Sequence, residues 1–215
     1  FNALVENAKA QAANFPFCTI EPNKGIVSVP DQRLQELGSL SSSQNIIPTK
    51  IEFVDIAGLV KGASKGEGLG NKFLGNLSNV DAIIHLVRCF EDNDITHVNN
   101  KVSPIEDIKV IETELLLSDL EKVERIIENY TKKNKGKKVD QSFLETLEKS
   151  RNFLENGNLL RNLSYSQSQE DTIKTFNLLT YKPIIYVCNV DEDSLINGNQ
   201  YSEQVEAYSN EKNLV

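Results

Sequence analysis

A carboxylate and a glycine in the spacing Asp-x-x-Gly follow an apolar segment of the chain. Residues 51–54 are mostly apolar, and Asp55-Ile56-Ala57-Gly58 comes directly after them. A carboxylate at the end of a strand can hold Mg²⁺ through a bound water, and a glycine amide can approach a γ-phosphate closely. The alternative is a strand followed by an ordinary turn that contains glycine. The motif alone therefore suggests a nucleoside triphosphate site without establishing one.

Glycine is unusually dense in the segment that follows. Five glycines fall within residues 58–70, and the last three are spaced as Gly-x-Gly-x-Gly. A dinucleotide-binding loop requires Gly-x-Gly-x-x-Gly, so this spacing does not favour a Rossmann site. A loop that reorders when the γ-phosphate is bound fits the glycine density better.

A second polar motif, Asn189-Val190-Asp191-Glu192, follows the apolar run 184–188. Many nucleotide-binding domains read guanine at this place with Asn-Lys-x-Asp, whose Asp accepts hydrogen bonds from the guanine edge. Here Glu192 replaces that Asp and Val190 replaces the Lys. Adenine presents one donor and one acceptor instead, and a polar site rejects a base that leaves its groups unpaired. The motif therefore favours ATP over GTP; the alternative is an asparagine cap in a polar loop.

Three further side chains could take part in the chemistry. Thr19 is a candidate ligand of Mg²⁺, because a switch threonine binds the metal when the triphosphate is present. His97 lies just beyond an apolar run, where it could position water or move a proton. For each of these two residues, an ordinary loop position is the commoner explanation when the residue is considered alone. His85 lies inside the apolar run and is expected to be a satisfied histidine of the core.

The elements that must position these groups follow from the pattern of apolar residues. The runs 81–88 and 184–188 predict strands that are covered on both faces. Residues 25–29 and 51–55 predict two further strands, and 31–40 predicts a short helix. The sequence therefore predicts an α/β fold of the P-loop NTPase type, with a mostly parallel sheet flanked by helices.

A helical segment separates the two apolar strands. Ser103-Pro104-Ile105-Glu106 has the spacing of a capping box with proline at the first helical position. Apolar residues then recur at alternating intervals of four and three, which predicts a coiled-coil seam: Leu116, Leu120, Val123, Ile127 and Tyr130. A returning helix is predicted from Phe143, Leu147, Leu154 and Leu160. We therefore expect an NTPase domain at 1–102 and 166–215, with an inserted antiparallel helical hairpin at 103–165.

The predicted tip of this hairpin carries a cluster of positive charge. Five lysines lie there on a chain whose net charge is −8: Lys132, Lys133, Lys135, Lys137 and Lys138. Such a tip could meet the phosphates of ribosomal RNA. A solvated turn is the commoner explanation of a lysine run.

Composition excludes several classes of protein. Of the residues, 39% are hydrophobic and 25% are charged, as in globular proteins that bury a core. No apolar stretch approaches the length of a membrane helix. Cys18, Cys89 and Cys188 lack any paired spacing, so neither a zinc site nor a disulfide framework is expected. Buried free thiols in a reducing cytoplasm are the better interpretation.

Three segments, 14–21, 53–74 and 87–90, resemble the Obg-like ATPase family, known as YchF in bacteria. The longest of them contains Phe-Val-Asp-Ile-Ala-Gly-Leu-Val-Lys-Gly-Ala-Ser-Lys-Gly-Glu-Gly. The resemblance implies a TRAFAC-class NTPase domain with a helical insertion and a following TGS domain. It also implies a cytoplasmic protein that prefers ATP to GTP and regulates translation or stress responses at the ribosome.

The same resemblance implies a role for each candidate residue. Thr19 and Asp55 would serve Mg²⁺, and Gly58 the γ-phosphate. The base would be bound by Asn189, by the main chain of Val190, and by Glu192. Leu59 stands where Ras-like proteins have a water-orienting Gln, and His97 matches a loop histidine proposed for that task in the family.

The chain departs from the family at its two ends. Phe1 matches the family just after Gly-Lys-Ser-Thr-Leu, so we expect a fragment that lacks the P-loop and the TGS domain. Two alternatives to an ATP-hydrolysing regulator stay open at this point. One is a helical-hairpin module that binds RNA or protein with marginal hydrolysis. The other is a GTPase of the Obg type, which Glu192 disfavours.

Overall fold

A computed structural model describes residues 5, 23–56, 69–92, 101–136 and 139–212 of the chain. The chain divides into two compact units, Phe1–Gly58 and Leu59–Val215, and each is described by itself. Among the described residues, no helix combines the length and the apolar character needed to cross a membrane.

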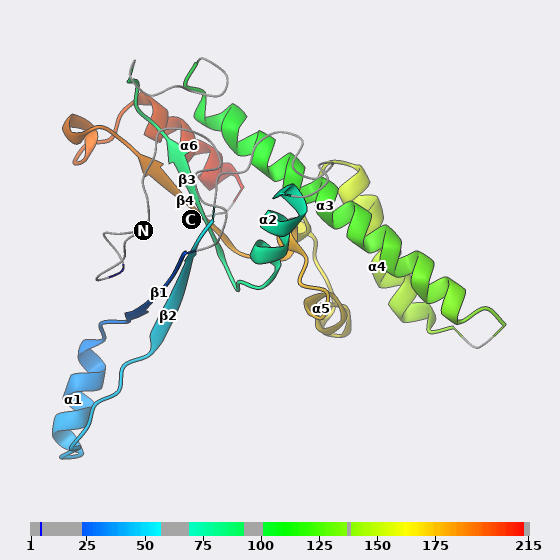
Figure 1. Ribbon diagram of the computed structural model, residues 1–215, viewed down its shortest axis with the longest axis horizontal. Helices are drawn as coiled ribbons and strands as arrows, with labels where there is room; N and C mark the ends of the chain where they lie inside the picture. Colours follow the sequence, from blue (N-terminus) through cyan, green and yellow to red (C-terminus); the bar gives the residue numbers. More distant parts are fainter. Residues whose placement is uncertain (1–4, 6–22, 57–68, 93–100, 137–138, 213–215) are drawn as a thin grey trace. The chain divides into compact units, whose positions relative to one another are not determined.

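The first unit contains two strands and one helix (Figure 1). Strand β1 (Asn23–Ser28) pairs antiparallel with β2 (Lys50–Asp55), in the register Asn23↔Asp55 to Ser28↔Lys50. Helix α1 (Gln32–Leu40) lies between them in the chain and begins at Asp31, whose carboxylate accepts from the Arg33 N–H at 3.0 Å. The predicted strands and short helix of this region are confirmed. Their sheet is antiparallel, however, because β1 and β2 follow one another through a single returning connection.

The second unit contains one parallel pair of strands and most of the helices. Strand β3 (Ile83–Arg88) pairs with β4 (Ile184–Asn189), in the register Ile83↔Ile184 to Arg88↔Asn189. The remaining elements, in chain order, are α2 (Leu69–Ser78), α3 (Pro104–Lys133), α4 (Gln141–Glu155), η1 (Leu160–Asn162), α5 (Gln167–Lys174), η2 (Leu179–Tyr181), η3 (Glu192–Ser194) and α6 (Gln200–Glu211). The mostly parallel sheet that the sequence predicts is thus limited, in the described residues, to β3 and β4.

Only one face of this strand pair is buried. Helix α3 contacts β3 and α6 contacts β4. Side chains on one face, such as Val87 and Ile184, are buried, whereas side chains on the other face are 40–63% exposed: Ile84, Leu86, Ile185 and Val187. The prediction that both faces are covered is therefore wrong for the described structure. A continuous apolar run does not by itself say which face a neighbouring helix occupies.

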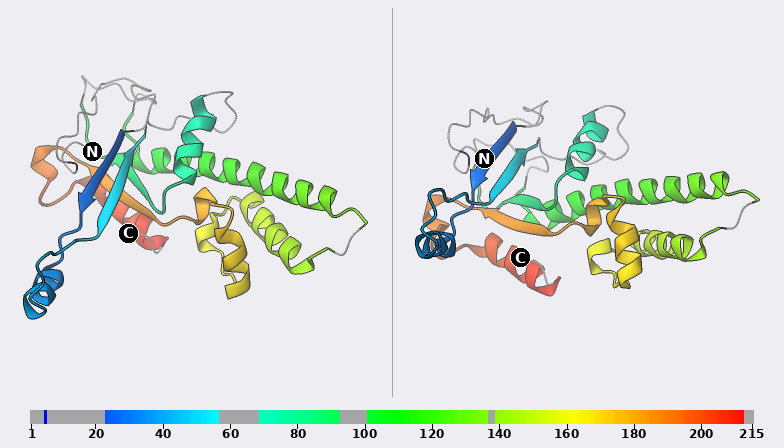
Figure 2. Two further views of the ribbon diagram at one scale, coloured as in Figure 1. Left: turned by 60° about the horizontal axis from the view of Figure 1, so that its bottom comes forward. Right: turned by 90° about the horizontal axis from the view of Figure 1, so that it is seen from below.

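Helices α3 and α4 lie side by side (Figures 1 and 2). Their shared core is formed by Val123, Leu147, Leu154, Leu160, Ile173 and Leu178. Predicted seam residues such as Leu120 and Ile127 pack against this core, and the Tyr130 and Phe143 rings meet at 4.4 Å between centroids. The predicted apolar faces of the two helices are found in contact. The assignment of 103–165 as an insertion, and of the pair as a coiled coil, stays a prediction.

The start of α3 differs from the predicted capping box. Ser103 is the N-cap and Pro104 is the first helical residue, as expected, but the Ser103 side chain makes no capping hydrogen bond. Complete capping boxes occur instead at α5, between Ser166 and Gln169, and at α6, between Asn199 and Ser202. Spacing alone does not fix the rotamer that brings a serine hydroxyl onto the helix.

Candidate nucleotide-binding site

The predicted base-binding motif lies at the carboxyl ends of two parallel strands. Strand β4 ends at Asn189, opposite Arg88, the last residue of β3. Beyond that pair, the Cys89 N–H donates to the Asn189 carbonyl oxygen at 2.7 Å. Open parallel sheets bind ligands at this edge. The position of Asn189, Val190 and Glu192 therefore fits a ligand site; their part in binding a base stays a prediction.

The side chains of Asn189 and Glu192 are available to a ligand. Both are exposed, and within the described part of the chain neither forms a hydrogen bond or ion pair through its side chain. Val190 is half-buried between them. An uncommitted amide and carboxylate at this edge can pair with the polar edge of a purine without first breaking contacts within the protein.

Asp191 has a different task from its neighbour Glu192. Its Oδ1 accepts from the Ser194 N–H at 2.9 Å, which caps the short helix η3. With its Oδ1 engaged in this cap, Asp191 is less suited than Glu192 to accept a hydrogen bond from a base. Glu192 therefore stays the predicted acceptor at this end of the motif.

Asn199 closes the loop that begins at Asn189. Its Nδ2 donates to the Cys89 carbonyl oxygen at 2.7 Å and to Ser194 Oγ at 3.3 Å. Its Oδ1 accepts from the Tyr201 and Ser202 N–H groups, each at 3.0 Å, and so caps α6. Sequence analysis missed this residue. The only signal available was an asparagine directly before a helix-like segment, which any N-cap would give.

Asp55 is the last residue of β2, as predicted, and is half-buried. Its Oδ2 accepts from Asn23 Nδ2 at 3.3 Å, across the register pair that closes the β1–β2 ladder. Among the described residues its Oδ1 has no hydrogen-bond partner. A carboxylate held by one oxygen and open at the other suits a metal-bound water, so Asp55 fits the predicted role toward Mg²⁺. Asp55 belongs to the first unit and the base-binding motif to the second.

The other predicted phosphate and metal residues lie outside the described residues. These are Thr19, Gly58 and His97, and the same holds for Leu59, Cys18, Lys137 and Lys138. Groups of three or more metal-binding side chains do not occur within the ranges that the structure describes. The predictions on these residues are thus carried forward as proposals.

Three of the predicted tip lysines are described and exposed. Lys132 and Lys133 end α3, and Lys135 lies in the turn that follows. Lys132 Nζ lies 2.5 Å from Glu128 Oε1, an ion pair one helical turn back. Lys133 and Lys135 form no ion pair with a described residue. Their charge is therefore available to an anionic partner.

A cluster of buried and half-buried polar side chains joins α3, the strand pair, η1 and α6: Glu112, Tyr186, Tyr208, His85 and Arg161. Glu112 accepts from the Tyr186 hydroxyl at 2.8 Å and from the Tyr208 hydroxyl at 2.7 Å. Burial and the Glu112 carboxylate raise the pKa of both phenols, so both stay protonated as donors. This cluster could not be predicted from the sequence, because Glu112 lies on a helix whose pattern indicates only an apolar seam.

His85 is not the satisfied core histidine that the sequence predicts. It lies against Tyr186, with ring centroids 5.6 Å apart, but its buried Nδ1 has no hydrogen-bond partner among the described residues. Burial lowers the pKa of His85 to about 4; the Glu112 carboxylate opposes this shift and the Arg161 guanidinium adds to it. The imidazole is therefore neutral at physiological pH and serves packing rather than catalysis.

Two of the cysteines are closer than their sequence separation indicates. Cys188 lies in β4 opposite Val87, Cys89 follows directly after β3, and both are free thiols. Cys89 is buried and Cys188 half-buried. Burial, together with the Cys188 thiol next to it, raises the pKa of Cys89 to about 12. The expectation of free rather than structural cysteines is confirmed for these two.

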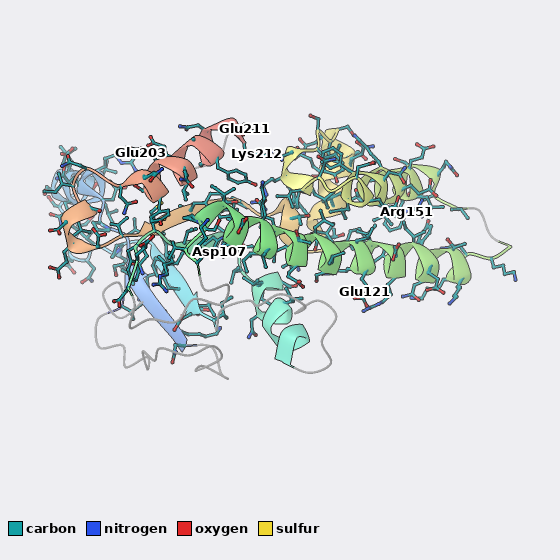
Figure 3. All side chains as sticks on the ribbon, turned by 90° about the horizontal axis from the view of Figure 1, so that it is seen from above. Asp107, Glu121, Arg151, Glu203, Glu211 and Lys212 are labelled. Atoms are coloured by element: carbon teal, nitrogen blue, oxygen red, sulfur yellow. The ribbon has the colours of Figure 1, made fainter. Side chains whose placement is uncertain are left out.

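A charged groove of about 480 Å³ lies between α3 and α4, away from the predicted site. Glu121 on α3 and Arg151 on α4 both line it, and Figure 3 labels the two side chains. Its other lining side chains are Glu124, Arg125, Ile127 and Glu128. Because charges of both signs alternate along it, the groove does not present a single sign of potential to a ligand.

Comparison with known proteins gives consistent matches. Residues 1–190 match the family model described as 50S ribosome-binding GTPase. The ribosome-binding ATPase YchF of Escherichia coli O157:H7 is 52% identical over 206 residues, which are 95% of this chain and 56% of that protein. The protein of the same name from Bacillus subtilis is 49% identical over 212 residues, which are 97% of this chain and 58% of that protein.

A solved structure agrees with these matches. The YchF GTPase of Schizosaccharomyces pombe is similar with a TM-score of 0.72 and 36% identity, over 93% of this chain and 55% of that one. The chain thus spans less than two thirds of the length of these relatives. By the family model and by these relatives, the chain belongs to the 50S ribosome-binding GTPases and, among them, to the YchF or Obg-like group of P-loop NTPases.

Proposed function

We propose that this chain forms part of the nucleotide site of a ribosome-associated protein that hydrolyses ATP in preference to GTP. The observation that carries this proposal is the motif Asn189-Val190-Asp191-Glu192 at the carboxyl edge of β3 and β4. Its Asn189 and Glu192 side chains are exposed and uncommitted within the described structure, whereas Asp191 is engaged in capping η3. The names of the relatives, ribosome-binding ATPases, agree with this proposal.

The proposed preference for adenine follows from which polar groups the base and the protein can pair with each other. Adenine presents an amino donor and a ring-nitrogen acceptor, which a carboxylate acceptor and a main-chain or amide N–H can satisfy. In this proposal Glu192 accepts from the amino group, while Asn189 and the main chain of Val190 complete the base site. Guanine would present a carbonyl oxygen where the amino group of adenine lies. That mismatch would leave the Glu192 carboxylate facing an acceptor without a hydrogen bond, and a site built to pair with polar groups rejects a base that leaves them unpaired.

The phosphate end of the proposed site is assigned to other residues of the chain, by the roles that the family resemblance implies for them. Asp55 and Thr19 would hold Mg²⁺, whose charge would stabilise the β- and γ-phosphate oxygens. The N–H of Gly58, which has no side chain, would donate to the γ-phosphate. Leu59 cannot orient a water molecule, so His97 is proposed to position the attacking water.

Turnover of ATP by the full-length protein tests this proposal. Replacing His97 with Ala should lower kcat by roughly 10²–10⁴-fold, the usual contribution of a group that handles the proton or water. The Kd for ATP should change little, because His97 is proposed to contact water rather than nucleotide. Glu124→Ala, on the exposed face of α3, is the control and should keep wild-type turnover. Wild-type kcat in His97→Ala would contradict the assignment.

Ribosome association through the tip lysines is a second proposal. Lys133 and Lys135 lie at the C-terminal end of α3 and in the turn that follows it. Both are exposed and form no ion pair within the described structure. Positive side chains that are not neutralised by the protein release counterions when they meet a phosphate backbone. A scaffolding module with marginal hydrolysis would keep this association while losing ATP turnover.

A further inference from the structure

The loop from Asn189 to Asn199 is tied to one residue of the neighbouring strand end at both of its ends. The Cys89 N–H donates to the Asn189 carbonyl oxygen at 2.7 Å. The Cys89 carbonyl oxygen accepts from Asn199 Nδ2, also at 2.7 Å. Both ends of the loop are therefore hydrogen-bonded to Cys89, and Glu192 belongs to the stretch of chain between these two contacts. Figure 1 shows this segment in orange between β4 and α6.

Two further contacts tie the middle of the loop to its end. Asn199 Nδ2 also lies 3.3 Å from Ser194 Oγ, at the last residue of η3. The Gly198 N–H donates to the Ser194 carbonyl oxygen at 2.9 Å, and Gly198 adopts a φ of 71°, a conformation that favours glycine. Glu192 and Ser194 are the first and last residues of η3. The hydrogen bonds to Ser194 therefore also restrict Glu192, the residue proposed to accept from the base.

The side chain of Asn199 uses all of its hydrogen-bonding groups. Its Nδ2 reaches Cys89 and Ser194, and its Oδ1 accepts from the Tyr201 and Ser202 N–H groups at the start of α6. Capping alone would be served as well by Asp or Ser. Only an amide supplies the cap acceptor and the two donors together, so the choice of asparagine points to the donors.

We infer that Asn199 is the positioning residue of the base-binding loop, holding Glu192 at the distance that selects adenine. The inference rests on the proposed function, in which Asn189, Val190 and Glu192 bind the base. Asn199 acts through the loop and not by touching the nucleotide. If the Asn199 side chain has no N–H donors, the loop keeps the Cys89–Asn189 hydrogen bond but loses the one between Asn199 and Cys89. Glu192 can then move relative to β3 and β4.

Two substitutions remove the Asn199 hydrogen bonds to Cys89 and Ser194 but keep the cap of α6. Asn199→Asp keeps the acceptor that caps α6 but replaces the donor with an oxygen, which repels the Cys89 carbonyl. Asn199→Ser also keeps a capping hydroxyl and loses the tie without adding charge. Gln200→Glu is the matched control: it is isosteric, adds the same charge one residue away on an exposed side chain, and leaves the contacts to Cys89 and Ser194 intact.

The test measures Kd for ATP and for GTP with the full-length protein by titration calorimetry, alongside far-UV circular dichroism and thermal unfolding. Asn199→Asp and Asn199→Ser should keep the wild-type spectrum and bind ATP at least about ten-fold more weakly, a loss of about 1.4 kcal/mol. The affinity for GTP should fall less, so the preference for ATP, expressed as the Kd for GTP divided by the Kd for ATP, should become smaller. Gln200→Glu should match wild type in both affinities.

Three outcomes would overturn the inference. Folded Asn199 variants with wild-type ATP affinity and wild-type selectivity would show that the tie does not position Glu192. An equal loss in Gln200→Glu would assign the effect to charge. A wild-type protein that binds neither nucleotide would overturn the proposed function as well, which distinguishes the failure of both from the failure of the Asn199 inference alone.

Discussion

Asp119 and Thr180 are joined by two hydrogen bonds to a single carboxylate oxygen. Asp119 Oδ2 accepts from the Thr180 N–H at 2.7 Å and from the Thr180 hydroxyl at 2.6 Å, while Oδ1 accepts from the Leu179 N–H at 2.9 Å. Asp119 is only 1% exposed and lies on α3, whereas Thr180 lies in η2, just before β4. The contact thus fixes α3 to the segment that leads directly into β4.

Replacing Asp119 with Asn should destabilise the protein by about 2–3 kcal/mol, because an amide group would face backbone donors that are buried without another acceptor. Urea unfolding at pH 7 measures this loss. Glu124→Gln is the matched control, since it makes the same chemical change on the exposed face of α3 and should shift stability by less than about 0.5 kcal/mol. Equal stability of the two variants would contradict the structural role of Asp119.

His85 should make stability depend on pH in mildly acidic solution. Burial lowers its pKa to about 4 in the folded protein, below the unfolded value of 6.5. The neutral folded form is therefore favoured above pH 6.5, and the unfolded chain takes up the proton first as the pH falls toward 4. Each unit of pKa corresponds to about 1.4 kcal/mol, so His85 should remove about 2–3 kcal/mol of stability by pH 4.5.

Urea midpoints of wild type and His85→Gln at pH 7.5 and pH 4.5 isolate this contribution, because every other titrating group is common to both proteins. The wild type should lose more stability than the variant over this range. A parallel loss in the two proteins would mean that His85 is protonated in the folded state at pH 4.5.

The core between α3 and α4 should be sensitive to truncation. Leu154 is fully buried there, so Leu154→Ala should cost about 2–5 kcal/mol through lost burial and the cavity that remains. Leu40→Ala, at a leucine of α1 that is 83% exposed, provides the control and should be nearly neutral. Thermal unfolding followed at 222 nm compares them; a Leu154→Ala protein as stable as wild type would argue against this packing.

Substitution of two tip lysines tests the proposed ribosome contact. Lys133→Gln combined with Lys135→Gln should weaken sedimentation with ribosomes and lower the slope of log affinity against log salt by about 1 for each lysine. Lys50→Gln combined with Lys109→Gln removes the same charge from exposed positions elsewhere and should leave the slope unchanged. Equal slopes for the two pairs would rule out a specific role for the tip.

Much of the local structure could be predicted because its causes are local. Asp31 before an apolar-periodic segment indicates the start of α1, and Pro104 indicates the start of α3. The four–three spacing that includes Val123 identifies the face of α3 that packs on α4. These signals depend on side-chain type and interval, which a sequence displays directly.

The contacts that organise the base-binding loop could not be predicted because they join residues far apart in the chain. The sequence around Asn199 indicates only a helix cap, whereas in the structure its Nδ2 donates to the Cys89 carbonyl oxygen. The sequence around Asp119 indicates a surface position on a charged helix, whereas its carboxylate is buried and accepts from Thr180. In both cases the second partner is set by the pairing of β3 with β4 and by the helices packed on it. No spacing within either segment encodes that pairing.

The central claim, that Glu192 makes this nucleotide site select adenine, is tested most directly by one comparison of affinities. The Kd values for ATP and GTP are measured with the full-length wild-type protein and with Glu192→Asp, a variant that restores the shorter guanine-reading carboxylate. The wild type should bind ATP more tightly than GTP, and Glu192→Asp should shift the ratio toward GTP by at least about ten-fold. Tighter binding of GTP by the wild type, or an unchanged ratio in Glu192→Asp, would contradict the claim.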